Sequence, residues 1–306
     1  MEGALDWGIK VVLWFQKFSP TLDFPFKVLT SMGGGEEFFM ILLPLIYWCV
    51  DRRSGIRLII LFLLSSYVNL AAKVLLDQPR PFQYDGRVQQ LYGAGGGGLP
   101  SGHTQNTVVV WGYLALRFRY TWLWIVAGFL MVLVPLSRIY LGVHFPTDLF
   151  GGYVLGAALL LVYLWLEPLA GTWLGKKGLR WQMGAALVVP AFLFFILPGS
   201  GEYGSKVCAT LMGIGLGFAL EGRWVGFESG GVSWARVLRF IIGAGGLFCL
   251  WLGLRVAFSG IEPALLFKSV RYGLMGLWVG FGAPWIFVKL QLAGRRVKDN
   301  TPLVTE

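Results

Sequence analysis

Long stretches without a charged residue recur along this 306-residue chain, and they constrain its fold more than any other feature. Most approach the ~20 residues that a helix needs to cross a bilayer, and a flanking Lys or Arg can extend the shorter ones. Charged residues make up 14% of the chain and mean hydropathy is +0.65. We therefore expect an integral membrane protein. The clearest stretches are 58–72, 120–137, 149–166, 181–201, 240–254 and 272–288.

Three shorter apolar runs, at 38–50, 104–116 and 207–220, complete the set of candidate spans. The sequence thus predicts an all-α, polytopic bundle of about nine transmembrane helices. We divide it into an N-terminal interfacial segment (1–34), a core (35–166), additional C-terminal transmembrane helices (167–290) and a cytoplasmic tail (291–306).

The first segment is predicted to hold a helix lying in the membrane interface. Its large apolar residues recur at helical spacing, with Lys10 and Lys17 beside them; they are Trp7, Val11, Trp14 and Phe18. The alternative is that these residues form the first turns of a longer span.

The distribution of Lys and Arg predicts the orientation. With nine spans, the basic loops and the basic C-terminal tail fall on one side, which the positive-inside rule assigns to the cytoplasm. The N-terminus and both histidines then face outward, as expected for a bacterial inner-membrane protein. The net charge of +10 indicates this topology and an affinity for anionic lipid, and it does not indicate nucleic-acid binding. Glu221 and Glu228 are expected in a solvated cytoplasmic loop.

Only two histidines occur, His103 and His144, and both lie in dense polar motifs. Histidine can act as a nucleophile, an acid, a base or a metal ligand, and packing rarely requires it. The three cysteines are scattered over apolar segments without paired spacing, so they are expected to be small buried residues; they are Cys49, Cys208 and Cys249. The sequence gives no support to a metal site of Cys and His.

Lys73 and Arg80 lie seven residues apart at the predicted edge of the membrane. A helix is expected to carry Lys73 until Pro79 ends it, and the following extended segment can turn Arg80 back toward the same point. Two cations placed in this way could hold an anion. The alternatives are a snorkelling lysine and an arginine that only sets topology.

Ser101, Gly102 and His103 stand immediately before an apolar helical run. Ser101 is predicted to be the N-cap, and the free N–H groups of such a helix start can hold phosphate. An ordinary cap beside an incidental histidine is the alternative. The glycine-rich run at 93–98 lacks the Gly-Lys-Ser/Thr ending of a phosphate loop, so we expect a flexible linker there.

Arg138, His144 and Asp148 lie where one predicted span ends and the next begins. Asp148 is close enough in sequence to accept the Nδ1 proton of His144, which would leave Nε2 free to attack. A simple Arg138–Asp148 ion pair is the alternative, but it leaves His144 unexplained.

Together these motifs resemble the three-part signature of the type 2 phosphatidic acid phosphatase superfamily. The resemblance covers about residues 35–166, and the last four spans lie outside it. The nine-span layout is also similar to the glucose-6-phosphatase branch. The signature positions, in chain order, are Lys73, Arg80, Pro81, Pro100, Ser101, Gly102, His103, Ser137, Arg138, Gly142, His144 and Asp148.

The resemblance implies phosphoryl transfer through a phosphohistidine. His144 would attack phosphorus, Asp148 would orient it, and His103 would protonate the leaving oxygen and then activate water. Phosphate would be bound by Lys73, Arg80, Ser101, Gly102 and Arg138, without a metal ion or other cofactor.

The substrate is less constrained than the reaction. A site at the outer edge of a bundle suits a lipid phosphate whose chains stay in the membrane, such as phosphatidate, phosphatidylglycerophosphate, or undecaprenyl phosphate or diphosphate. A soluble sugar phosphate and phosphotransfer to another acceptor remain alternatives. From a different class, the chain could be a transporter of anions or lipids. The oligomeric state stays open.

Overall fold

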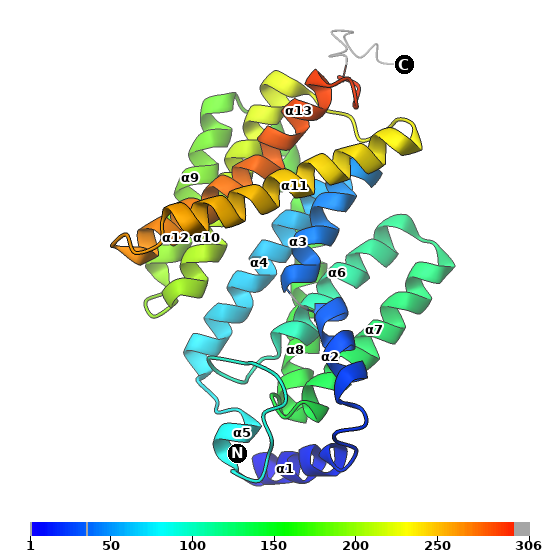
Figure 1. Ribbon diagram of the computed structural model, residues 1–306, viewed down its shortest axis with the longest axis vertical. Helices are drawn as coiled ribbons and strands as arrows, with labels where there is room; N and C mark the ends of the chain where they lie inside the picture. The colour runs from blue at the N-terminus through cyan, green and yellow to red at the C-terminus, as the bar shows by residue number, and fades with distance from the viewer. Residues whose placement is uncertain (1, 35, 297–306) are drawn as a thin grey trace. The chain divides into compact units, whose positions relative to one another are not determined.

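The computed structural model describes residues 2–34 and 36–296, and within them the chain folds into helices and no strand (Figure 1). One isolated β-bridge joins Phe227 to Arg295. The prediction of an all-α membrane protein is confirmed. The longer helices, in chain order, are α1 (Glu2–Gln16), α2 (Asp23–Gly34), α3 (Glu36–Leu45), α4 (Arg52–Leu76), α6 (Gly102–Phe118), α7 (Thr121–Tyr140), α8 (Pro146–Gly175), α9 (Leu179–Ile196), α10 (Gly201–Leu220), α11 (Ser233–Ala257) and α12 (Ala264–Leu277).

Short elements join or extend these helices. They are η1 (Ile46–Val50), α5 (Pro81–Tyr84), η2 (Glu221–Val225), η3 (Trp278–Gly282) and α13 (Ala283–Lys289), where η marks a single π-helical turn. Helix is present at each of the nine predicted spans. In the described residues, six helices are long and apolar enough to cross a membrane: α4, α7, α8, α9, α10 and α11. The count of nine therefore stays a prediction.

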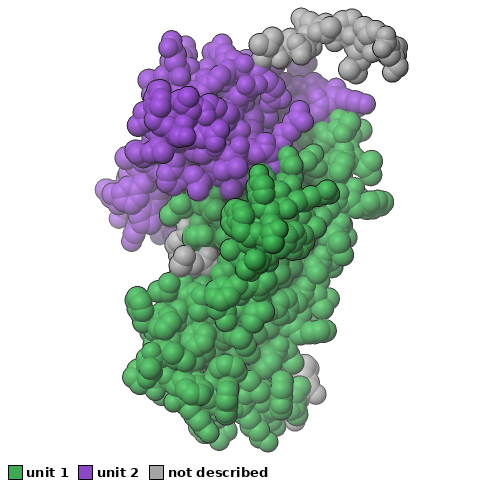
Figure 2. Space-filling view, turned by 90° about the vertical axis from the view of Figure 1, so that its right-hand side faces the viewer, with its two compact units in different colours: residues 1–43, 57–174, 192–208 green, residues 44–56, 175–191, 209–306 purple. Residues whose placement is uncertain are grey.

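The chain forms two compact units, coloured separately in Figure 2. Unit 1 comprises residues 1–43, 57–174 and 192–208, and unit 2 comprises residues 44–56, 175–191 and 209–306. All the predicted site residues belong to unit 1. The predicted cytoplasmic tail lies largely outside the described residues, which end at 296.

In unit 1, helix α1 packs its own apolar face on the segments around the histidine motif. Leu5, Ile9 and Val12 are buried, and they pack in one cluster with residues of α7 and α8 and with Phe145. Trp7 and Trp14 are instead exposed, which an interfacial helix requires of its lipid-facing side chains.

Small residues and a polar network bring the start of α6 against α4 and α8. A Cβ added to Gly152 on α8 would lie 2.7 Å from the Ser101 carbonyl oxygen, so only glycine permits this approach. From α4, Asn69 donates to Gln105 at 2.8 Å and to the Pro100 carbonyl at 3.3 Å. These buried bonds fix the turn that leads into α6, because an unpaired amide inside a membrane protein is costly.

In unit 2, glycines allow α10 and the α12–η3 segment to touch backbone to backbone. A Cβ on Gly213 would approach the Gly273 carbonyl oxygen to 1.9 Å, and one on Gly217 would lie 2.9 Å from the Gly280 Cα. Close approach through small residues is a common way for helices to associate in membranes, where lipid offers no hydrophobic driving force.

Two expectations about unit 2 and the cysteines are wrong. Glu221 is fully buried rather than solvated: it forms an ion pair with Arg52 and accepts the Phe227 N–H at 2.7 Å. Burial of this carboxylate is tolerated because Arg52 neutralises its charge and the Phe227 N–H donates to its other oxygen. Cys49 and Cys208 are buried as expected, whereas Cys249 is exposed on α11.

Candidate active site

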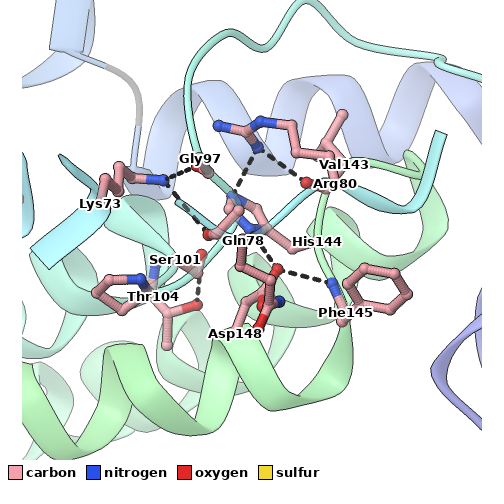
Figure 3. Close-up of polar contacts among 12 residues, drawn as sticks. Lys73, Gln78, Arg80, Gly97, Ser101, Thr104, Val143, His144, Phe145 and Asp148 are labelled. Atoms are coloured by element: carbon pink, nitrogen blue, oxygen red, sulfur yellow. Dashed lines mark hydrogen bonds and ion pairs between the residues drawn. The ribbon is translucent and has the colours of Figure 1, made fainter. Parts of the chain in front are cut away.

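His144 and Asp148 form the centre of the candidate site, on the turn between α7 and α8. The His144 Nδ1 lies 3.1 Å from Asp148 Oδ2, and the same oxygen accepts the Phe145 N–H at 2.9 Å (Figure 3). The carboxylate therefore fixes the tautomer with the proton on Nδ1 and leaves the Nε2 lone pair available. The predicted pairing of these two residues is confirmed.

The turn that carries His144 depends on Gly142. Its φ of +73° lies in the left-handed region, and an added Cβ would lie 2.2 Å from the Gln89 carbonyl oxygen. Gly142 thus lets the chain reverse within a few residues, which places His144 just before the first turn of α8. Asp148 stands in that first turn, where the helix dipole favours a carboxylate.

The start of α6 meets this pair directly. The Ser101 N–H donates to the Asp148 carbonyl oxygen at 2.9 Å, and the Ser101 hydroxyl caps α6 by accepting from the Thr104 N–H and hydroxyl. The prediction that Ser101 is the N-cap is confirmed. Gly102 is the first residue of the helix, and His103 follows it. The Nε2 of His103 is buried and makes no hydrogen bond within the described residues.

Lys73 and Arg80 converge on the glycine-rich loop at 93–98. Lys73 Nζ donates to the carbonyl oxygens of Gly97 at 2.6 Å and Gly98 at 3.3 Å. Arg80 donates through Nε to the Gly96 oxygen at 3.0 Å and through Nη2 to the Gly95 oxygen at 2.7 Å. The expectation of a plain flexible linker is wrong, because successive carbonyls of this loop hold two cations of the site.

Arg80 also faces the ring of His144. Its Nη1 donates to the Val143 carbonyl oxygen at 2.8 Å and lies 3.3 Å from His144 Nε2. In Figure 3 the imidazole lies between Arg80 and Asp148. The helix that carries Lys73 ends at Leu76, earlier than the predicted stop at Pro79, because Asp77 adopts a left-handed φ of 38°.

Arg138 reaches the site from the last turn of α7. Its Nη1 donates to the Thr30 hydroxyl at 2.8 Å, and its Cζ lies 4.9 Å from the centroid of the Tyr92 ring. In the described residues it forms no ion pair with Asp148. The simple ion-pair alternative for these two residues is therefore wrong.

The electrostatics of the site favour a neutral His144. Its side chain is 2% exposed. Burial lowers the pKa of His144 well below 6.5, and the charges of Lys73, Arg80 and Arg138 lower that pKa further. A neutral imidazole carries a lone pair on one ring nitrogen, which is the form that can act as a nucleophile or base. In the described residues, no group of three His, Cys, Asp or Glu side chains lies together as metal ligands would.

Three side chains of the site were not predicted from the sequence. Gln78 donates through Nε2 to Asp148 Oδ1 at 2.6 Å, and Thr30 and Tyr92 contact Arg138. All three are polar residues in ordinary surroundings, and their partners lie far away in the sequence. No local pattern marks them.

Comparison with known families decides the identity. The model described as the PAP2 superfamily matches residues 54–171, and the model described as the PAP2 superfamily phosphatase, transmembrane extension, matches residues 205–295. The chain belongs to the PAP2 superfamily. It is a membrane phosphatase, a hydrolase of phosphoric esters, and the predicted resemblance is confirmed. The extension model also covers most of the helices that lie beyond the signature motifs.

Proteins similar to this chain include three whose names state different substrates. Glucose-6-phosphatase catalytic subunit 1 of Haplochromis nubilus is 25% identical over 95% of this chain and 85% of its own length. Sphingosine-1-phosphate phosphatase 2 of Homo sapiens is 29% identical over 63% of this chain, and phosphatidylglycerophosphatase B of Bacillus subtilis is 33% identical over 36%. The chain spans 49% and 56% of the length of these last two. No solved structure gives a significant match.

Replacing Gln78 with Leu tests how firmly Asp148 must be held. A hydrogen bond to a charged acceptor contributes about 1.5–3 kcal/mol of stabilisation. Without the bond to Oδ1 we therefore expect kcat to fall roughly ten- to hundredfold. Phosphate release by purified protein measures it. Asp77→Asn is the matched control, because Asp77 is exposed and Asn tolerates its left-handed backbone. Unchanged kcat in Gln78→Leu would contradict a role for this contact.

Proposed function

We propose that this PAP2 protein is a metal-independent phosphatase that removes phosphate from a phosphorylated membrane lipid through a phosphohistidine on His144. The observation that carries the proposal is the environment of the His144 ring. Its Nδ1 contacts Asp148 Oδ2, and its Nε2 faces the guanidinium of Arg80. This is the arrangement of an oriented nucleophile beside a group that binds a phosphoryl oxygen.

Hydrolysis proceeds in two displacements. His144 Nε2 attacks phosphorus, and the ester oxygen leaves with a proton from the imidazolium form of His103, which gives the phosphohistidine, the free alcohol and a neutral His103. His103 then takes a proton from water, and the resulting hydroxide attacks phosphorus and releases phosphate and neutral His144. Asp148 stabilises the positive imidazolium between the two steps.

Phosphate is held by Lys73, Arg80 and Arg138, together with the Ser101 hydroxyl and the Gly102 N–H at the start of α6. Two buried atoms support this assignment, because Arg138 Nε and His103 Nε2 make no hydrogen bond within the described residues. A phosphoryl oxygen and the leaving oxygen would satisfy them. Three cations supply the charge stabilisation that other phosphatases take from metal ions.

Substrate binding requires the glycine-rich loop to release Arg80. Of the five N–H donors of a guanidinium, Arg80 uses four on the carbonyls of Gly95, Gly96 and Val143 and on His144 Nε2. A phosphate that binds Arg80 through two oxygens needs two donors. The phosphoryl group must therefore replace loop carbonyls and separate Arg80 from His144.

A lipid phosphate fits the site best, because its chains can stay in the bilayer while its headgroup reaches the helix ends where His103 and His144 lie. Phosphatidate, phosphatidylglycerophosphate, and undecaprenyl phosphate or diphosphate are the substrates that we propose to test. The site faces the outer, periplasmic side of a bacterial inner membrane, and the C-terminus is cytoplasmic, because the basic loops define the inner side. The interfacial position proposed for α1 agrees with exposed Trp7 and Trp14.

Glucose 6-phosphate is a second candidate substrate. It is favoured by the similarity to glucose-6-phosphatase catalytic subunit 1, which extends over 95% of this chain. Transfer of the phosphoryl group to an acceptor other than water would use the same phosphohistidine.

Two alanine substitutions in the loop should change KM in opposite directions. Gly96 has a φ of +65°, so Gly96→Ala strains the loop conformation that holds Arg80 by about 1–2 kcal/mol. Substrate then displaces the loop more easily, and KM falls. Gly95 has a φ that alanine can adopt, and there is open space around its Cα. Gly95→Ala therefore lowers the entropy of the loop that has released Arg80, favours the loop conformation that holds Arg80 and raises KM a few-fold. Steady-state kinetics on one substrate measures both. Shifts in the same direction, or none, would contradict exchange between loop and phosphate.

A substrate panel tests the function itself. Purified protein in EDTA is offered phosphatidate, phosphatidylglycerophosphate, undecaprenyl diphosphate and glucose 6-phosphate, and phosphate release is compared with that of His144→Ala. We expect release from a lipid phosphate that falls by several orders of magnitude in the variant, because the nucleophile is lost. Faster turnover of glucose 6-phosphate would favour the second candidate. Equal release by both proteins would refute the proposal.

A further inference from the structure

Arg138 is held in the site by two side chains that lie outside the signature motifs. Its guanidinium lies between the Thr30 hydroxyl, which is 2.8 Å from Nη1, and the Tyr92 ring, which is 4.9 Å from Cζ. Thr30 stands on α2, before the range 54–171 that the PAP2 model matches. Tyr92 stands on the loop between α5 and α6.

Arg138 needs such support because its surroundings repel it. It is 2% exposed, Lys73 and Arg80 occupy the same site, and no carboxylate pairs with it in the described residues. A long guanidinium side chain in a field of like charge would otherwise turn away from the other cations.

Thr30 is a fixed partner for Arg138. Its side chain is fully buried, and α2 is anchored to the end of α7 at a second point. There the Tyr140 hydroxyl donates to Asp23 at 2.6 Å, and the Phe26 and Tyr140 rings stack at 4.5 Å. These contacts hold the backbone of α2 that carries Thr30 beside the end of α7.

Tyr92 links Arg138 to the proposed acid and base. The flat face of its ring lies against the guanidinium, which is a cation–π contact, and its ring centroid lies 6.4 Å from that of His103 at an interplanar angle of 84°. One aromatic ring thus borders two groups that the proposed mechanism uses.

We infer that Thr30 and Tyr92 are positioning residues that hold Arg138 with its Nε directed to the reacting phosphoryl group. Nε is buried and makes no hydrogen bond within the described residues, so it is a donor available to phosphate. Anchoring the opposite edge of the guanidinium lowers the entropy lost when phosphate binds. This inference rests on the proposed function, in which Arg138 binds phosphate.

Matched variants separate positioning from simple packing. Thr30→Val keeps the shape and removes the hydroxyl, whereas Thr30→Ser keeps the hydroxyl. Tyr92→Leu removes the ring, whereas Tyr92→Phe keeps it. We expect kcat/KM to fall roughly tenfold or more in Thr30→Val and a few-fold in Tyr92→Leu, with Thr30→Ser and Tyr92→Phe within about twofold of wild type. The inhibition constant for orthophosphate should rise in parallel.

The effect of Thr30→Val in the Arg138→Ala background distinguishes positioning of Arg138 from packing alone. If Thr30 acts through Arg138, Thr30→Val causes little further loss there, as a double-mutant cycle measures. Wild-type kinetics in Thr30→Val and Tyr92→Leu, while Arg138→Ala is impaired, would overturn this inference and leave the proposed function intact. An equal loss from Thr30→Val in both backgrounds would also overturn it. Full activity of Arg138→Ala would contradict the role of Arg138 itself.

Discussion

The gathering of three cations around one carboxylate is the constraint on which the rest of the site depends. In the described residues, Lys73, Arg80 and Arg138 surround the His144–Asp148 pair, and burial of so much like charge costs less when most of the donors have partners. Backbone carbonyls of the glycine-rich loop and the hydroxyl of Thr30 supply the partners that carboxylates would otherwise provide. Neutral acceptors leave the net positive charge in place. The folded site therefore does not need a bound anion, and its net positive charge can still attract a phosphate dianion.

The helices of unit 1 place this cluster at helix ends, where polar groups are compatible with apolar spans. The first turns of α6 and α8 meet because Gly152 permits contact and because the Ser101 N–H donates to the Asp148 carbonyl oxygen. The starts of both helices thus lie against each other in the region that carries the site. The proposed catalytic groups lie in turns and at helix ends, and none lies in the apolar middle of a span.

The sequence predicted those features that depend on local spacing, and it missed those that depend on distant pairing. The His144–Asp148 contact and the Ser101 cap follow from four- and three-residue separations, which helix geometry fixes. Gln78 lies 70 residues from Asp148, Thr30 lies 108 from Arg138, and Arg52 lies 169 from Glu221, so no periodic pattern reveals them. The sequence of the glycine-rich loop predicts a linker and not a part of the site, because the loop contributes backbone carbonyls, which no side-chain type indicates.

Trapping the phosphoenzyme tests whether His144 is the nucleophile. His103→Ala is incubated with an aryl phosphate labelled on phosphorus, whose leaving oxygen needs no proton, so that formation proceeds while hydrolysis, which needs a base, is slow. We expect an acid-labile, alkali-stable label on the peptide that contains His144, and no label when His144→Ala is added. Aryl alcohol release without a labelled protein, or a label on another residue, would contradict it.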